Sequence, residues 1–339
     1  MPEPKRCDFG VIGGHAAVLY TMQNAAGLSV SVTNLGATVT RLLVPDRRGQ
    51  RADVVLGCDS APEYLAQRAY FGATVGRVAN RIDRARFELS GNRYALYPSD
   101  PPHHLHGGRL GWDKALWVTR FVEERSIRFE YVSSDKEEGY PGTVRAAVTY
   151  ELGEELNLRV LMTATTDALT LVNMAHHGYW NLAGHDSGSV LDHELTLFAS
   201  RYTPGLPIPT GEVASVRATP LDFTVSKEIG RDLPPAGYDS NFVVDGPAEV
   251  LRPVAYLRDT RSGRSLTLSA NQPGVQFYSG NFLDGTIAGK GTTYARHAGL
   301  CLETQCFPNA VNVPAWRQQV LLAPAETYQH CMLMQFSAA

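Results

Sequence analysis

The sequence lacks an apolar run long enough to cross a bilayer, and residues 1–20 carry proline and charge where a secretory signal would place its apolar core. It also lacks an excess of either charge, because 31 Lys and Arg stand against 34 Asp and Glu, for a formal net charge of -3. Such a balance gives no electrostatic argument for nucleic acid or a membrane as partner. We therefore expect a cytoplasmic protein whose partner is a small or neutral molecule.

Cysteine is scarce, and the sequence has no recognisable metal or nucleotide motif. The five cysteines are an odd number spread along the chain, at Cys7, Cys58, Cys301, Cys306 and Cys331. This pattern fits free thiols better than a disulfide framework. Cys301 and Cys306 are close, but no His or Cys cluster accompanies them at zinc-ligand spacing. We predict no metal and no cofactor, since the chain also has no phosphate loop or dinucleotide fingerprint.

Helical periodicity is nearly missing, which counts against folds built on crossover helices. One short helix is expected after Ser60, where Pro62 and Glu63 follow as in a capping box. Alternating apolar residues instead predict strands near 28–32, 127–131, 144–150, 156–162, 266–268, 275–277 and 300–302. Without a repeat or linker, the pattern favours an all-β protein, one large antiparallel β-sandwich domain over 1–339, although the length also admits two domains.

Residues 171–184, LVNMAHHGYWNLAG, concentrate more chemistry than any other stretch. In an extended chain His177, Tyr179 and Asn181 face one side and His176 faces the other. A proton-transfer group, an aromatic platform with a hydroxyl and an amide together suit a polyhydroxylated ligand. A lone histidine is more often a buried structural residue, so a functional histidine here would need catalytic partners elsewhere in the chain.

Two polar clusters precede this stretch. Asn80 and Arg81 stand among small and apolar residues, and the arginine could bind a ligand hydroxyl or carboxylate, or form an ordinary ion pair. Three histidines, His103, His104 and His106, follow a pair of prolines. The prolines favour an irregular backbone, and the two glycines after His106 allow a ligand to approach the backbone closely. One functional histidine is therefore favoured over a three-ligand metal site.

Acidic and amide side chains follow in the C-terminal third. Asp239 lies between aromatic residues and could bind a ligand or form an Asx turn. Gln276 alternates with apolar neighbours, as does Glu303 in GLCLETQ. A carboxylate in so apolar a strand is either paired or has a perturbed pKa, as catalytic acids and bases do. Together with the histidines, these groups match proton-transfer chemistry on a neutral polyol.

Five motifs resemble the aldose 1-epimerase family, the galactose mutarotases, in order and in register. They are LHGGRLGWDKALW (105–117), EEGYPG (137–142), VNMAHHGYWNLAG (172–184), QPGVQFYSGNFLDG (272–285) and GLCLETQCFPNAVN (299–312). The resemblance runs from GRVANRI (76–82) to Pro324. It implies a large β-sandwich with an open sugar cleft, without metal or organic cofactor, acting as a monomer or a loose homodimer.

Matched motif by motif, the resemblance implies that His177 is the general acid and Glu303 the general base in interconverting the α and β anomers of free hexoses such as galactose or glucose. It implies a substrate-binding set of Asn80, Arg81, His106, Tyr179, Asp239 and Gln276. The family usually has Asn where this chain has His176, but alignment to Tyr179 and Asn181 assigns the acid role to His177.

Three alternatives stay open. A mutarotase of phosphorylated hexoses would need extra cations, for which Arg77, Arg81 and Arg84 cluster in sequence. A glycoside hydrolase could use Asp239 and Glu303 as its two carboxylates, and an aryl glycoside would then release its aglycone. A non-catalytic sugar-binding β-sandwich would not need the acid and base together. The preferred aldose does not follow from the sequence.

Overall fold

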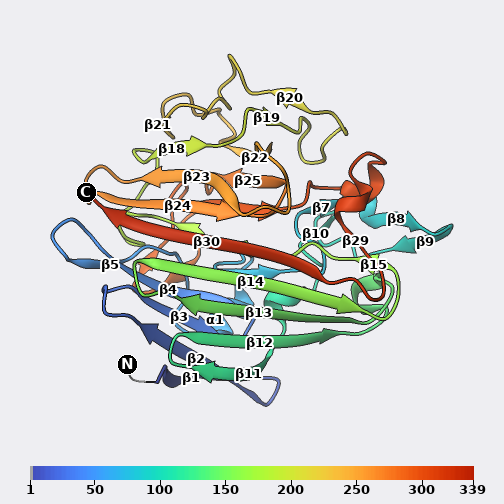
Figure 1. The fold of residues 1–339 in the computed structure, drawn as a ribbon, viewed down its shortest axis with the longest axis horizontal. Helices are drawn as coiled ribbons and strands as arrows, with labels where there is room; N and C mark the ends of the chain where they lie inside the picture. The colour runs from blue at the N-terminus through green and yellow to red at the C-terminus, as the bar shows by residue number, and fades with distance from the viewer. Residues whose placement is uncertain (1–2) are drawn as a thin grey trace.

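The computed structural model describes residues 3–339 and is an all-β protein, with 45% of its residues in strands and 6% in helices. Its largest sheet has nine antiparallel strands. In Figure 1 these strands follow one another from β11 near the bottom of the view to β18 near the top. In spatial order they are β11 (Val118–Glu123), β12 (Ser126–Ser133), β13 (Val144–Leu152), β14 (Asn157–Thr166), β30 (Tyr328–Ala338), β24 (Arg264–Ala270), β23 (Arg252–Arg258), β18 (Glu194–Leu197) and β21 (Lys227–Glu228).

Two further antiparallel sheets form the layer that packs against it. One has five strands, β1 (Lys5–Ile12), β2 (His15–Gln23), β3 (Ser29–Thr33), β4 (Thr38–Pro45) and β5 (Arg51–Asp53). The other has six, in the order β17 (Tyr179–Trp180), β28 (Leu300–Gln305), β25 (Gly274–Tyr278), β22 (Asp239–Val243), β19 (Arg201–Tyr202) and β20 (Ala214–Ser215). An antiparallel bridge between Val55 and Trp180 joins these two sheets.

One hydrophobic cluster lies between the layers and draws on all three sheets. It includes Phe129 of the nine-stranded sheet, Val30 of the five-stranded sheet and Leu302 of the six-stranded sheet, each fully or almost fully buried. Apolar residues alternate along these strands because successive side chains point to opposite faces. The faces of the six-stranded sheet are therefore distinct, one packed in the core and the other free to line a site.

Short two-stranded ribbons and helical turns complete the fold. The ribbons pair β7 (Arg81–Ile82) with β10 (His104–Leu105), β6 (Ala73–Val75) with β16 (Ala175–His177), β8 (Arg86–Leu89) with β9 (Asn92–Ala95), β15 (Thr170–Leu171) with β29 (Leu321–Leu322), and β26 (Ala288–Gly289) with β27 (Thr292–Thr293). The helix α1 spans Ala61–Ala66, and the 3-10 turns are η1 (Asp83–Ala85), η2 (Trp112–Lys114), η3 (Glu137–Gly139), η4 (Ala310–Asn312) and η5 (Arg317–Gln319).

The strands and the helix expected from the sequence are confirmed. The alternating segments fall in β3, β12, β13, β14, β24, β25 and β28. The helix begins directly after Ser60, whose backbone N–H donates a hydrogen bond of 3.1 Å to Glu63 Oε2. Within residues 3–339 no helix is both long and apolar enough to cross a bilayer. The prediction of a single domain stays a prediction, and the shared core cluster supports it.

Candidate active site

The outward face of the six-stranded sheet carries two rows of polar side chains. Residues that pair across neighbouring strands point to the same face. One row therefore contains Tyr179, Cys301, Tyr278 and Asp239, which are successive register partners on β17, β28, β25 and β22. The next row contains Glu303 of β28 and its partner Gln276 of β25. The core-facing residues between them, such as Leu302 and Phe277, anchor the sheet below the site.

The ribbon formed by β7 and β10 brings Asn80 and His106 to the same place. The His106 backbone N–H donates to the Asn80 carbonyl oxygen at 3.1 Å, and the Asn80 N–H donates to His106 Nδ1 at 3.1 Å. Since Nδ1 accepts this bond, the other ring nitrogen, Nε2, carries the proton of a neutral His106. A Cβ on the next residue, Gly107, would overlap the Gly76 carbonyl oxygen, so only glycine allows this turn.

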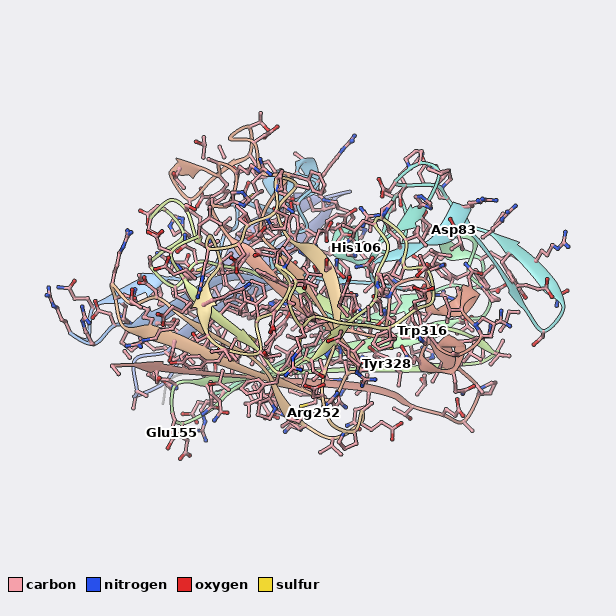
Figure 2. The ribbon with its side chains drawn as sticks, turned by 90° about the horizontal axis from the view of Figure 1, so that it is seen from above. Asp83, His106, Glu155, Arg252, Trp316 and Tyr328 are labelled. Carbon is pink, nitrogen blue, oxygen red and sulfur yellow. The ribbon has the colours of Figure 1, made fainter. Side chains whose placement is uncertain are left out.

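All eight residues proposed from the sequence line one cleft of about 240 Å³. This volume is below the roughly 300–1,000 Å³ of pockets for drug-sized ligands and suits a smaller one. The lining residues are Arg68, Ala69, Tyr70, Asn80, Arg81, Leu105, His106, His177, Tyr179, Asp239, Gln276, Tyr278, Phe282, Leu283, Ile287 and Glu303. In the view of Figure 2, His106 lies nearer the middle of the molecule and Asp83 lies out beside the cyan ribbon of β8 and β9.

A histidine and a glutamate face each other inside the cleft. His177 Nε2 lies 3.6 Å from Glu303 Oε2, and both side chains are almost completely buried. Glu303 Oε2 has no hydrogen-bond partner within the protein. Burial, and next the charge of Asp239, raise the pKa of Glu303 to about 8. Burial lowers the pKa of His177 to about 3. Near neutral pH the pair therefore holds one proton, which in the free cleft resides on Glu303.

The remaining polar groups are oriented by contacts with one another. Gln276 Nε2 donates to Asp239 Oδ1 at 2.7 Å, which leaves Gln276 Oε1 without a partner. Burial raises the pKa of Asp239, and the bond from Gln276 opposes that rise. Arg81 Nε donates to Asp100 Oδ2 at 2.7 Å, so this arginine is held by an ion pair. A ligand with several hydroxyls could satisfy the free acceptors and displace water from them.

Aromatic rings hold the His177 imidazole on several sides. Its ring centroid lies 5.3 Å from Tyr179 and 5.5 Å from Tyr70, and both arrangements are stacked. The His106 ring meets it edge to face at 5.1 Å. Its other nitrogen, Nδ1, lies 3.7 Å from the Cys301 sulfur. These contacts fix the plane of the imidazole, so that Nε2 points towards Glu303.

His106, His177 and Glu303 also form a possible metal-ligand set. One ligand atom from each lies within 4.8 Å of the others. Zinc bound at about 2.1 Å would bring tetrahedral ligands to roughly 3.4 Å from one another, so this set would have to contract. A ligating Glu303 would also have to be ionised, whereas its pKa is raised by burial. The spacing and protonation fit a hydroxyl group between these side chains better than a metal ion.

Several other residues that stood out in the sequence lie outside the cleft. His104 bonds the Tyr97 carbonyl oxygen and the Tyr140 hydroxyl, and His103 lies 3.2 Å from Asp83. His176 is buried with neither ring nitrogen bonded. The Asn181 amide donates to the carbonyl oxygens of Gly188 and Ala298 and therefore supports the fold.

The three clustered arginines do not converge. Arg77 is 1% exposed and does not line the cleft. Its guanidinium donates to the carbonyl oxygens of Pro141 and Gly142. Arg84 is largely exposed and lies 4.0 Å from Asp83. Arg81 is the member of this group that lines the cleft.

Sequence reasoning did not select Tyr70, Tyr278 or Phe282, which also line the cleft. Tyr70 stands between Ala69 and Phe71 with no motif to mark it, and only folding brings its ring 4.7 Å from His106. Tyr278 could have been found, because it alternates with Phe277 on the same face as Gln276. Asp100, which holds Arg81, lies in a proline-rich loop and carried no signal of its own.

Known proteins resemble this chain in sequence and in fold. The family model described as aldose 1-epimerase matches residues 18–335. Galactose mutarotase of Bos taurus is 46% identical over 321 residues, 92% of each chain, and aldose 1-epimerase of Escherichia coli is 34% identical over 330 residues, 94% of this chain and 95% of its own. The crystal structure of an aldose epimerase homologue from C. elegans has a TM-score of 0.90 at 29% identity, covering 96% of this chain and 100% of its own. The chain therefore belongs to the aldose 1-epimerase family.

Proposed function

We propose that the cleft binds the pyranose ring of a free hexose with its C1 hydroxyl at Glu303 and its ring oxygen at His177. The protein is an isomerase that interconverts α and β anomers, the activity of its family and of the mutarotases it resembles. The observation that carries the residue assignment is the 3.6 Å separation of His177 Nε2 from an unpartnered Glu303 Oε2 inside this cleft. A general acid and a general base so placed can act on the two oxygens bonded to the anomeric carbon, the C1 hydroxyl and the ring oxygen.

The reaction proceeds by opening and reclosing the ring. Glu303 removes the proton from the C1 hydroxyl, the C1–O5 bond breaks as the C1 carbonyl forms, and His177 delivers its proton to O5. Rotation by half a turn about C1–C2 presents the other aldehyde face. In reclosure O5 attacks C1, the O5 proton returns to His177, and Glu303 returns its proton to the C1 oxygen. The enzyme therefore ends as it began. Each such proton transfer contributes typically ~10²–10⁴ in rate.

The one shared proton has to move before ring opening can begin. It resides on Glu303 in the free cleft, because burial raises the pKa of Glu303 and lowers that of His177. A C1 hydroxyl that donates to Glu303 favours the carboxylate, and a ring oxygen that accepts from His177 favours the imidazolium. Sugar binding thus shifts the proton to His177 without changing the proton count of the pair.

The rest of the cleft holds the ring while C1 turns. Gln276, Asp239 and Asn80 offer acceptors and donors for hydroxyls, and Tyr179 provides an aromatic wall. Of the two arginines in the lining, Arg81 is paired with Asp100 and Arg68 is exposed. This distribution favours an uncharged hexose over a phosphorylated one, since no buried cluster of unpaired cations among residues 3–339 faces the cleft.

Matched substitutions at adjacent histidines test the assignment. His177→Asn should lower the enzyme-catalysed mutarotation of α-D-glucose or α-D-galactose, followed by polarimetry, by at least ~10²-fold. The control His176→Asn changes the neighbouring buried ring, which makes no hydrogen bond, and should keep the activity. Near-normal rates in a folded His177→Asn protein would overturn the assignment. Rates on galactose, glucose, xylose, arabinose and glucose 6-phosphate would define the substrate.

Location and assembly remain proposals. We propose a cytoplasmic enzyme, supported by five cysteines that are all free thiols, four of them buried. We also propose a monomer or a loose homodimer, because one chain supplies both proposed catalytic residues to the cleft. Sedimentation at several protein concentrations would measure the assembly.

A further inference from the structure

The proposed acid has a second ring nitrogen that the reaction does not use. If His177 gives and regains its proton through Nε2, then Nδ1 must keep its own proton in both states. A histidine whose Nδ1 lacks an acceptor can place its proton on Nε2 when neutral, and it then cannot take a proton back there. The group that contacts Nδ1 therefore decides whether Nε2 can cycle. This inference rests on the proposed function.

The Cys301 thiol occupies that position. Its sulfur lies 3.7 Å from His177 Nδ1 and is completely buried. Cys301 and Glu303 are two residues apart on β28 and point to the same face of the sheet. One strand thus supplies a contact to each nitrogen of the imidazole. Tyr179, the register partner of Cys301 on β17, lies beside the thiol on the same face of the sheet.

We propose that Cys301 is a positioning residue that accepts a hydrogen bond from His177 Nδ1–H and so reserves Nε2 for proton exchange with the sugar. A sulfur atom is a weak acceptor, whereas a carboxylate or a backbone carbonyl is a strong one. A strong acceptor would stabilise the imidazolium and make His177 a weaker acid. The ring oxygen of a sugar is a poor base, so a weak partner that orients the ring without raising its basicity serves this acid best.

The surroundings agree with a neutral thiol in this role. Burial raises the pKa of Cys301 well above its ordinary value, and the nearby Glu303 and Asp239 act in the same direction. The groups that face the His177 ring are Glu303, His106, Tyr70, Tyr179 and Cys301, and His176 adjoins it in sequence. Among these side chains, Cys301 is the one within hydrogen-bond reach of Nδ1. The backbone carbonyl of His177 itself raises the pKa of the imidazole, but burial outweighs it. A thiolate there would attract the Nδ1 proton strongly, and burial prevents it.

Three substitutions at this position separate orientation from folding. Cys301→Ala removes the acceptor and should lower kcat about tenfold with KM within about twofold. Cys301→Ser restores an acceptor and should recover most of kcat. Cys301→Asp offers a strong acceptor and should move the acid limb of the kcat profile to higher pH, because it raises the pKa of His177. The control Cys306→Ala removes another buried thiol, which bonds the Gln319 carbonyl oxygen instead of the His177 ring, and should leave kcat unchanged.

Nitrogen-15 NMR of the ¹⁵N-histidine-labelled full-length chain reports the tautomer directly. Wild-type and Cys301→Ser protein should show His177 protonated at Nδ1, and Cys301→Ala should show proton occupancy at Nε2. An unchanged tautomer in Cys301→Ala, or a Cys301→Ala enzyme with unchanged kcat, would overturn the proposal. A fully active His177→Asn enzyme would instead overturn the assignment of His177 as the acid. The tautomer of His177 in the Cys301 variants is measured separately from that activity, so the two failures can be distinguished.

Discussion

Replacing Glu303 by Gln should abolish mutarotation and at the same time stabilise the protein. The carboxyl is 3% exposed and its pKa is raised by burial to about 8 from an ordinary value of 4.5. This difference corresponds to about 5 kcal/mol for a fully ionised carboxylate. The cleft admits water, and the glutamine amide must itself find partners. We therefore expect Glu303→Gln to raise the free energy of unfolding by about 2 kcal/mol and Tm by a few degrees.

The gain should depend on pH in a defined direction. The folded state of the wild type holds the Glu303 proton more tightly than the unfolded state. The contribution of this group to stability is therefore complete below pH 4.5 and is lost as the pH rises through about 8. Glutamine does not titrate. The Tm of Glu303→Gln should match that of the wild type near pH 4.5 and exceed it increasingly up to pH 8.

Thermal unfolding by circular dichroism from pH 4.5 to pH 8.5, together with polarimetry, tests both halves of this prediction. Glu88→Gln is a suitable control, because Glu88 lies exposed on β8 and should change neither Tm nor activity. A Glu303→Gln protein that is less stable than the wild type at pH 8 would refute the argument that the carboxylate is held at an energetic cost. Activity above ~1% of the wild type would refute its role as the base.

Two further predictions concern charges buried away from the cleft. Arg77→Met removes the donor to several buried carbonyl oxygens and should lower the free energy of unfolding by about 3 kcal/mol in a urea titration, whereas Arg84→Met at an exposed position should change it by less than about 0.5 kcal/mol. Lys290→Met removes the cation that lies 2.8 Å from the buried Asp53 and should lower the same free energy by about 3 kcal/mol. A value near zero would show that the backbone donors and Arg41, whose Nε lies 3.7 Å away, are sufficient for Asp53.

Local sequence pattern was sufficient for seven of the strands and for the sides that their residues face. Gln276 and Glu303 alternate with large apolar residues, and a period of two forces them onto the face opposite the core. The same rule did not extend to Asn181. It shares parity with His177 and Tyr179, but the strand ends at Trp180, and the Asn181 amide turns to cap neighbouring carbonyl groups. Alternation predicts facing only while the chain remains extended.

The sequence by itself determined the all-β class, the short helix after Ser60 and a set of polar residues suited to proton transfer, because periodicity and residue chemistry are local properties. Only the tertiary structure decided which of these residues meet. The contact between His177 and Glu303 joins positions far apart in the chain and depends on strand register, which no local pattern specifies. The same register placed Cys301 at the Nδ1 atom of the imidazole, and packing of the loop between α1 and β6 placed Tyr70 beside the ring. Burial then shifted the pKa of His177 and of Glu303, since desolvation depends on everything packed around them.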